Sequence, residues 1–359
     1  MNTTGQLREL GQSIWLDNIT RRMLDDGTLA NYIAEDHVTG LTSNPSIFDK
    51  AISGGNDYDE SITRLTQEGL EEEKLFFALA LEDLRRAADL FEPAFRTSDG
   101  TDGYVSLEVS PLLVDNTRAS IESAVTLHKQ GGRENLFIKI PGTPAGVPAI
   151  EEAAYRGVPI NVTLLFSREQ YIASAEAWMR GLERRIAEGR SPDVASVASL
   201  FVSRWDAAVA DEVSPQLKNR LGIAIARRTY RAYRELRETP RWRRLVAAGA
   251  PPQRLLWGST GTKDPEASDT LYVEALAAPD TINTIPDKTL LAFADHGKLH
   301  GAMPGDGGDC EQVIEQFKAA GIDDAALADK LQREGAEKFV KSWNDLLARL
   351  AEKSSAVAS

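Results

Sequence analysis

Short apolar runs alternate with amphipathic stretches along the whole chain, and this alternation limits the possible folds more than any other feature. Eight runs have the length and the apolar or β-branched content of strands. They are Ser13–Asp17, Val38–Ser43, Tyr104–Val109, Leu136–Ile140, Ile160–Leu164, Val194–Val202, Leu255–Gly258 and Thr281–Thr284. Strands that alternate with helices are parallel and joined by helical crossovers. The pattern therefore indicates an α/β protein, and eight units predict a (β/α)8 TIM barrel, with a doubly wound open sheet as the alternative.

The stretches between these runs carry apolar residues at three- and four-residue spacing, which is typical of helices. They include Arg21–Glu35, Glu72–Phe91, Ala119–Gln130, Gly146–Arg156, Arg168–Glu188, Trp205–Leu236 and Ala267–Leu276. No change in composition marks a boundary, so we predict one barrel domain over residues 1–359, with a C-terminal helical extension at about 310–350. The helical stretch Asp323–Leu350 is expected to pack outside the barrel.

Composition and charge exclude several classes of protein. The formal net charge of −13 disfavours nucleic-acid binding, although local cations in a cleft can still bind a small anion. No apolar run approaches the ~18 residues of a membrane span. The beginning of the chain lacks the apolar core of a secretory signal, and the single cysteine, Cys310, excludes an intrachain disulfide. We expect a cytoplasmic protein without nucleic-acid or membrane partners.

Lys139 is the most informative candidate for chemistry. It interrupts the apolar run Leu136–Ile140, and strand alternation places it on the same face as Phe137. An ammonium group that faces a barrel interior is costly to bury, so a neutral amine would be available to attack a carbonyl. The alternative is a strand-end lysine that extends to water or pairs with an acid.

Other polar residues lie at or near the carboxyl ends of the predicted strands, where barrel enzymes place their working residues. Asp17 and Glu108 could transfer protons beside the lysine, or serve only as ion-pair partners. Asn44 and Asn161 could orient hydroxyls or the lysine, or satisfy loop backbone groups. Thr163 lies in the fifth run.

Basic and hydroxyl residues follow the later strands, where phosphate sites are common in barrels. Ser199 and Arg204 come at or after the sixth strand, and Ser259 and Lys263 follow the seventh. A guanidinium binds phosphate through paired hydrogen bonds, although a solvated loop charge is the simpler interpretation. His296 and His300 are four residues apart but have no obvious third ligand, so no metal site is predicted.

Several of these residues lie in segments through which the chain resembles the transaldolase family. The segments occur in family order and span most of the chain. They are Trp15–Asn18, Thr39–Phe48, Ser106–Pro111, Phe137–Thr143, Ile160–Ser167 and Ser199–Arg204. The loop Ser259–Lys263 departs from the many members that carry an arginine after the seventh-strand serine, and is similar to the longer bacterial branch.

The resemblance implies a barrel with Lys139 as the Schiff-base lysine and no cofactor. It also implies that Glu108 and Thr163 hold a proton-relaying water and that Asp17 is the acid/base at the cleaved bond. The remaining residues would bind substrate: Asn44, Asn161, Ser199, Phe201, Arg204, Ser259 and Lys263.

The implied reaction transfers a dihydroxyacetone unit from sedoheptulose 7-phosphate to glyceraldehyde 3-phosphate, giving erythrose 4-phosphate and fructose 6-phosphate. Sugar phosphates would be the partners, with the protein a monomer or homodimer. One alternative is a fructose 6-phosphate aldolase, a shorter relative that tends to have glutamine and tyrosine in place of Glu108 and Phe201. Another is a non-catalytic sugar-phosphate-binding barrel, which would have no use for a buried amine.

Overall fold

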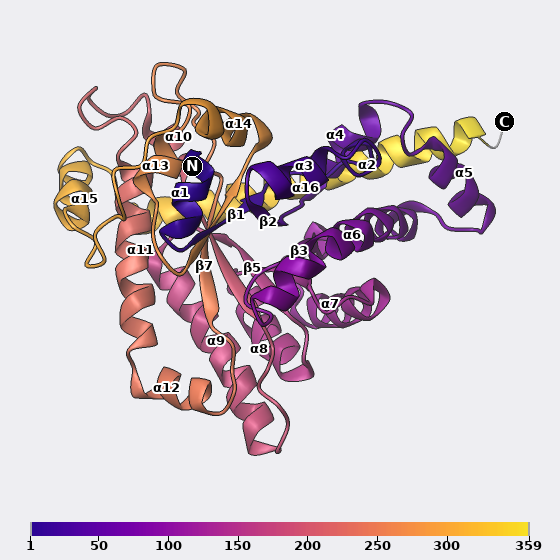
Figure 1. Cartoon of the computed structure of the whole chain (residues 1–359), viewed down its shortest axis with the longest axis horizontal. Helices are drawn as coiled ribbons and strands as arrows, with labels where there is room; N and C mark the ends of the chain where they lie inside the picture. The colour runs from indigo at the N-terminus through magenta and orange to yellow at the C-terminus, as the bar shows by residue number, and fades with distance from the viewer. Residues whose placement is uncertain (1, 358–359) are drawn as a thin grey trace.

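The computed structural model describes residues 2–357, and eight parallel strands surround its centre (Figure 1). The strands are hydrogen-bonded in the order β2-β1-β8-β7-β6-β5-β4-β3. Their bounds are β1 (Gln12–Leu16), β2 (Val38–Leu41), β3 (Val105–Glu108), β4 (Leu136–Pro141), β5 (Ile160–Leu165), β6 (Ser196–Phe201), β7 (Gln253–Gly258) and β8 (Thr281–Ile285). Each overlaps one of the eight predicted runs, which confirms the strand prediction.

The seam between β2 and β3 decides between a barrel and an open sheet. The backbone N–H of Leu41 donates to the carbonyl of Tyr104 at 3.0 Å, and Ser43 Oγ donates to the carbonyl of Ser106 at 2.7 Å. Gly40 permits this approach, because a Cβ there would lie 2.6 Å from the Tyr104 carbonyl oxygen. The eight strands thus form a nearly closed barrel, and the (β/α)8 prediction is confirmed.

Helices cover the outside of the barrel and extend beyond it (Figure 1). They are α1 (Thr3–Glu9), α2 (Arg21–Asp25), α3 (Thr28–Glu35), α4 (Pro45–Ser53), α5 (Asp59–Gln67), α6 (Glu72–Thr97), α7 (Thr117–Gly131), α8 (Gly146–Arg156), α9 (Arg168–Ala187), α10 (Ser203–Val209), α11 (Leu221–Arg237), α12 (Pro240–Ala247), α13 (Leu271–Ala275), α14 (Asp287–His296), α15 (Cys310–Ala319) and α16 (Asp324–Val357), with a 3₁₀ turn at Pro111–Leu113.

Two stretches predicted as single helices are interrupted. Arg21–Glu35 is divided into α2 and α3 at Gly27, whose φ of 81° no helix can accommodate. Trp205–Leu236 is divided into α10 and α11, and buried Asp206 joins the two. Its carboxylate accepts the first backbone N–H groups of α11, from Leu221 at 2.9 Å and Gly222 at 3.2 Å. The interruption thus has its own capping chemistry.

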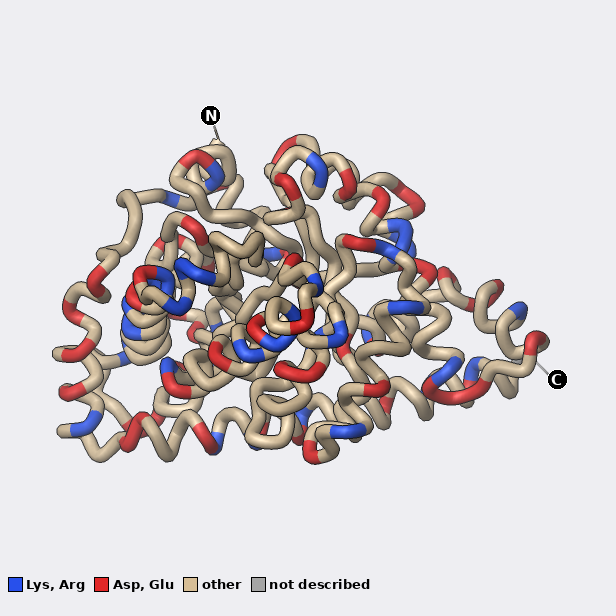
Figure 2. Tube along the Cα trace, turned by 90° about the horizontal axis from the view of Figure 1, so that it is seen from below, with Lys and Arg blue, Asp and Glu red and all other residues tan. Residues whose placement is uncertain are grey.

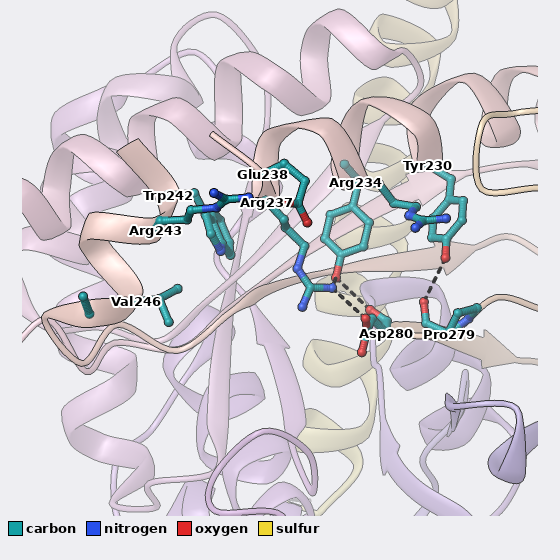
Figure 3. A pocket seen from close by; sticks show the side chains of 11 residues that line it. Tyr230, Arg234, Arg237, Glu238, Trp242, Arg243, Val246, Pro279 and Asp280 are labelled. Atoms are coloured by element: carbon teal, nitrogen blue, oxygen red, sulfur yellow. Dashed lines mark hydrogen bonds and ion pairs between the residues drawn. The ribbon is translucent and has the colours of Figure 1, made fainter. Parts of the chain in front are cut away.

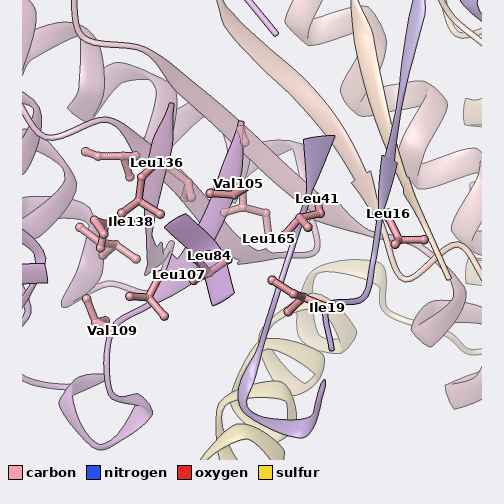
Figure 4. Close-up of a cluster of buried hydrophobic side chains, with 14 of the residues drawn as sticks. Leu16, Ile19, Leu41, Leu84, Val105, Leu107, Val109, Leu136, Ile138 and Leu165 are labelled. Atoms are coloured by element: carbon pink, nitrogen blue, oxygen red, sulfur yellow. The ribbon is translucent and has the colours of Figure 1, made fainter. Parts of the chain in front are cut away.

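The hydrophobic core has an outer and an inner part. Between strands and helices lie side chains such as Leu136, Ile138 and Leu165 (Figure 4). Inside the barrel, a separate cluster is formed by Trp15, Tyr104, Phe137, Val197, Leu256 and Ile282. This inner layer fills the barrel and leaves the residues at the carboxyl ends of the strands as a polar layer above it.

The last helix, α16, lies across the carboxyl ends of the strands. Buried Gln332 donates from Nε2 to the carbonyls of Gly142 and Leu164, each at 3.0 Å, just beyond β4 and within β5. Farther along, Ser342 bonds Ser46 of α4 at 2.7 Å. This helix packs against the outside of the barrel at its mouth, a place that the sequence did not specify, and Phe339 contributes to the cavity there.

Acidic and basic residues are interspersed along the surface helices (Figure 2), consistent with many exposed ion pairs such as Arg133 with Asp89. No helix in the described part of the chain is long and apolar enough to cross a membrane.

Candidate active site

Three polar residues lie side by side toward the carboxyl ends of neighbouring strands. In the strand register, Glu108 of β3 is opposite Lys139 of β4, and Lys139 is opposite Asn161 of β5. All three are buried, with 4%, 5% and 0% of their surfaces exposed. The register therefore brings together an acid, an amine and an amide that the sequence places far apart.

Lys139 points into the barrel, as strand alternation predicts. Phe137, on the same face, belongs to the inner cluster, whereas Leu136, Ile138 and Ile140 belong to the outer core. The amine Nζ lies 3.2 Å from Glu108 Oε2 and donates to the Ser43 carbonyl at 2.9 Å. One hydrogen bond and one ion pair thus hold the amine in position above the inner layer.

Glu108 and Asn161 form the buried support of this amine. Burial raises the pKa of Glu108, although the neighbouring Lys139 acts against the rise. Asn161 donates to Ser106 Oγ at 3.1 Å and accepts from Ser199 Oγ at 2.7 Å. With both ends of its amide bonded, Asn161 is held in one orientation and fixes the Ser199 hydroxyl beside the lysine.

Asp17 follows β1 and supplies the second carboxylate. Its Oδ1 accepts a hydrogen bond from Thr42 Oγ1 at 2.9 Å, and that hydroxyl lies 2.7 Å from Thr284 Oγ1. Burial raises the pKa of Asp17, while Lys139 and the Thr42 bond oppose the rise. A carboxyl group with a raised pKa can exchange a proton nearer neutral pH than an exposed aspartate can.

A cavity of about 390 Å³ opens at this end of the barrel, and most of the sequence-predicted residues line it. Those residues are Asp17, Asn44, Lys139, Thr163, Ser199, Phe201, Arg204, Ser259 and Lys263. Glu108 and Asn161 are not part of the lining, and they flank Lys139 on the two neighbouring strands. Asn44 also caps α4, because its Oδ1 accepts from the N–H of Ile47 at 3.1 Å. The amide thus has the structural role that the sequence left open, while it also borders the cavity.

The cavity has a basic side. Arg204 and Lys263 both line it, and neither has an ion-pair partner among residues 2–357. Burial lowers the pKa of the Arg204 guanidinium from its ordinary high value. Ser259 has a φ of 55°, which is unusual for a serine. Its Oγ lies 2.9 Å from Ser203 Oγ. These groups together can bind an anion at the part of the rim that follows β6 and β7.

Several residues of the cavity wall were missed by sequence reasoning, and Lys50, Thr284 and Phe339 are among them. Thr284 had a detectable signal, because it is a polar residue at the end of a predicted strand. Lys50 lies in α4 and Phe339 in α16, and neither helix has a sequence feature that would place it at the barrel mouth.

A second cavity, of about 560 Å³, lies near the amino ends of β7 and β8 and is separate from the candidate site (Figure 3). Its basic groups are largely paired, since Arg237 contacts Asp280 at 2.9 Å and Arg243 pairs with Glu238. It contains none of the predicted site residues.

No group of three or more His, Cys, Asp or Glu side chains suited to a metal ion occurs among the described residues. His296 is exposed and bonded to Asp269 and Asp295, each at 3.0 Å. His300 is also exposed.

The chain is similar to known proteins over almost its whole length. The sequence matches the Transaldolase/Fructose-6-phosphate aldolase family over residues 14–350. It is 44% identical over 358 residues to the transaldolase of Thiobacillus denitrificans, covering 98% of this chain and 100% of that protein. It is 43% identical over 366 residues to the transaldolase of Parafrankia sp. strain EAN1pec, covering 98% of each chain. With transaldolase 2 of Nostoc punctiforme it shares 40% identity over 367 residues, or 97% of this chain and 96% of the other. The chain belongs to the Transaldolase/Fructose-6-phosphate aldolase family.

Proposed function

We propose that this chain catalyses the transaldolase reaction through a Schiff base on Lys139. The observation that carries the proposal is the buried amine of Lys139, 5% exposed, in the wall of a cavity that the partly buried carboxyl group of Asp17 also lines. Lys139 Nζ attacks the ketone carbon of sedoheptulose 7-phosphate, and water leaves to give an iminium ion. The iminium accepts the electron pair of the broken carbon–carbon bond and becomes an enamine.

Asp17 acts at the bond that breaks. Its carboxylate takes the proton of the hydroxyl next to that bond, and erythrose 4-phosphate leaves as the aldehyde. The enamine then attacks the aldehyde carbon of glyceraldehyde 3-phosphate, and Asp17 returns the proton to the new hydroxyl. Hydrolysis of the iminium releases fructose 6-phosphate and restores Lys139. The Thr42 hydroxyl, 2.9 Å from Asp17, holds the carboxylate in place through both steps.

Glu108 and Thr163 relay protons while the carbinolamine forms and loses water. Glu108 Oε2 and Thr163 Oγ1 are both buried, and neither makes a hydrogen bond within residues 2–357, although Glu108 pairs electrostatically with Lys139. Buried polar atoms are normally bonded, and one bridging water would serve both. Such a water has a carboxyl group with a raised pKa on one side and a hydroxyl group on the other.

Arg204, with Lys263 and Ser259, binds the phosphate that both acceptor aldehydes carry at the end remote from the reacting carbon. Asn44, Ser199 and Phe201 line the space between that phosphate and Lys139. The fixed distance between lysine and cation then selects acceptors that carry a terminal phosphate.

A transfer assay tests the proposal. Fructose 6-phosphate with erythrose 4-phosphate should yield glyceraldehyde 3-phosphate, and omission of erythrose 4-phosphate should abolish nearly all of the yield. A fructose 6-phosphate aldolase would instead release free dihydroxyacetone from fructose 6-phosphate alone. A sugar-phosphate-binding barrel without activity would give no product in either mixture.

We also propose a location and an oligomeric state for the enzyme. We take it to be cytoplasmic, and either a monomer or a homodimer. The only cysteine, Cys310, is free and buried, as expected for a protein of a reducing compartment. Sedimentation equilibrium at several concentrations distinguishes the monomer, the homodimer and larger assemblies.

A further inference from the structure

Arg204, in the first turn of α10, is held in an unusual way for a cation. Its guanidinium carbon lies 5.0 Å from the ring centre of Phe201 and 5.8 Å from that of Phe339. One of its nitrogens, Nη1, is buried and has no hydrogen-bond partner in the described part of the chain. The cation is thus supported by aromatic faces, while part of its hydrogen-bonding capacity is unused.

The helix α16 provides residues that surround the Arg204 guanidinium. Gln332, Gly335 and Phe339 recur at three- and four-residue spacing and therefore share one face of the helix. Gln332 anchors that face to the barrel through the Gly142 and Leu164 carbonyls. Phe339 is 5% exposed and borders the cavity.

Gly335 matters because of the space it leaves. A Cβ at this position would lie 2.9 Å from Leu164 Cδ2 and 3.1 Å from Arg204 Nη1. Glycine is less favourable than alanine in a helix interior, and Gly335 does not have the positive φ that would require it. Close approach of both Leu164 and the Arg204 guanidinium is therefore the physical reason for a glycine here.

A space next to Arg204 could accommodate a displaced guanidinium. Between α10 and α16 lies a smaller cavity of about 160 Å³, which Arg204 and Gly335 line together with Glu334. A guanidinium that moved into this cavity would approach both Glu334 and Lys338, and it would no longer point toward the barrel mouth.

We propose that Gly335 and Phe339 are positioning residues that hold Arg204 toward the phosphate of the acceptor substrate, so that α16 completes the phosphate end of the active site. This inference rests on the proposed function. A guanidinium that is already oriented loses less conformational freedom when it binds phosphate, so the two residues raise the affinity for phosphorylated acceptors without touching the substrate.

The variant Gly335→Ala tests the inference, with kcat and KM measured for glyceraldehyde 3-phosphate and for unphosphorylated glyceraldehyde. Loss of a hydrogen bond to a charged group corresponds to about 10- to 150-fold. We expect roughly a 10-fold loss in kcat/KM for glyceraldehyde 3-phosphate, mainly through KM, and a much smaller change for glyceraldehyde. Alanine favours the helix but its Cβ would crowd Leu164, so the melting temperature is measured as well, and a change in stability alone should affect both acceptors equally.

Three further variants make the test specific. Glu337→Ala, at an exposed position of the same helix, should leave both acceptors unchanged. Phe339→Leu removes the aromatic face but keeps an apolar side chain, and should lower the preference for the phosphorylated acceptor. In an Arg204→Ala background, Gly335→Ala should have no further effect on that preference, because the two residues act through the same group.

Equal losses with both acceptors, or an unchanged preference for the phosphorylated one, would overturn the role of Gly335. If Arg204→Ala alone abolishes the preference while Gly335→Ala and Phe339→Leu do not, the phosphate site stands and only the role of α16 is wrong. If the wild-type enzyme shows no preference for the phosphorylated acceptor, the phosphate site and the role of α16 are both wrong.

Discussion

The hydrogen bond between Thr42 and Asp17 allows a quantitative prediction about pH. In Thr42→Val, a methyl group replaces the hydroxyl that donates to Asp17 Oδ1 at 2.9 Å. The bond favours the charged carboxylate. Burial already raises the pKa of Asp17, and loss of the bond should raise this pKa further. A hydrogen bond to a charged group contributes about 1.5–3 kcal/mol, and 1.36 kcal/mol corresponds to one pKa unit. The expected shift is about 1–2 units upward.

The pH profile of kcat/KM measures this shift. Asp17 must be ionised to take a proton during cleavage, so activity falls as the pH drops through its pKa. The acid limb of Thr42→Val should therefore lie about 1–2 pH units above that of the wild-type enzyme. Comparison of variants with the same substrate cancels the titration of the substrate phosphate.

Two controls separate this bond from its surroundings. Thr42→Ser keeps the donor and should keep the wild-type limb. Thr284→Val removes the hydroxyl 2.7 Å from Thr42 but leaves the Thr42–Asp17 bond, so its limb should move much less. A uniform loss of activity in Thr42→Val, with an unmoved acid limb, would refute the assignment of Asp17 as the base.

The remaining predictions concern the carboxylates and metal independence. Asp17→Asn should block cleavage yet still allow a reducible adduct with fructose 6-phosphate, whereas Glu108→Gln should slow adduct formation. Each loss of rate should be about 10²–10⁴-fold. Wild-type behaviour of both variants would contradict the proposed roles. Burial raises the pKa of Asp206 from 3.8 to about 6, so the folded state binds the proton more tightly and the free energy of unfolding should fall as the pH rises between these values. Asp206→Asn should flatten that slope in urea titrations, and an unchanged slope would count against it. Dialysis against a strong chelator should leave transfer activity intact, and a loss that a divalent ion restores would point to a metal-dependent aldolase.

The barrel could be predicted from sequence because its signals are local. Alternation along a strand is a property of neighbouring residues, so Lys139 and Phe137 are assigned to the same inward face before any contact is known. The rule that barrel chemistry lies at the carboxyl ends of strands then gathers Asp17, Glu108 and Lys139 into one site. The register adds what the sequence could not, namely that Glu108 and Lys139 are direct neighbours.

The helices that cover the site could not be placed from sequence. Phe339 reaches the cavity only because α16 crosses the barrel mouth, and that path depends on contacts between residues distant in sequence, such as Gln332 with Leu164. The helical period reports which residues share a face but not what the face packs against. The division at Gly27 is different, because glycine is tolerated in helices and its positive φ has no unique sequence signal.

The central claim is that Lys139 forms the Schiff base, and borohydride trapping tests it most directly. Reduction in the presence of fructose 6-phosphate should attach a sugar-derived fragment to the peptide that contains Lys139, identified by peptide mass spectrometry. Lys139→Ala should lose both the adduct and nearly all turnover, while Lys129→Ala, at an exposed position of α7, should retain both. A fragment on a different lysine, or no fragment on an enzyme that is fully active, would contradict the account.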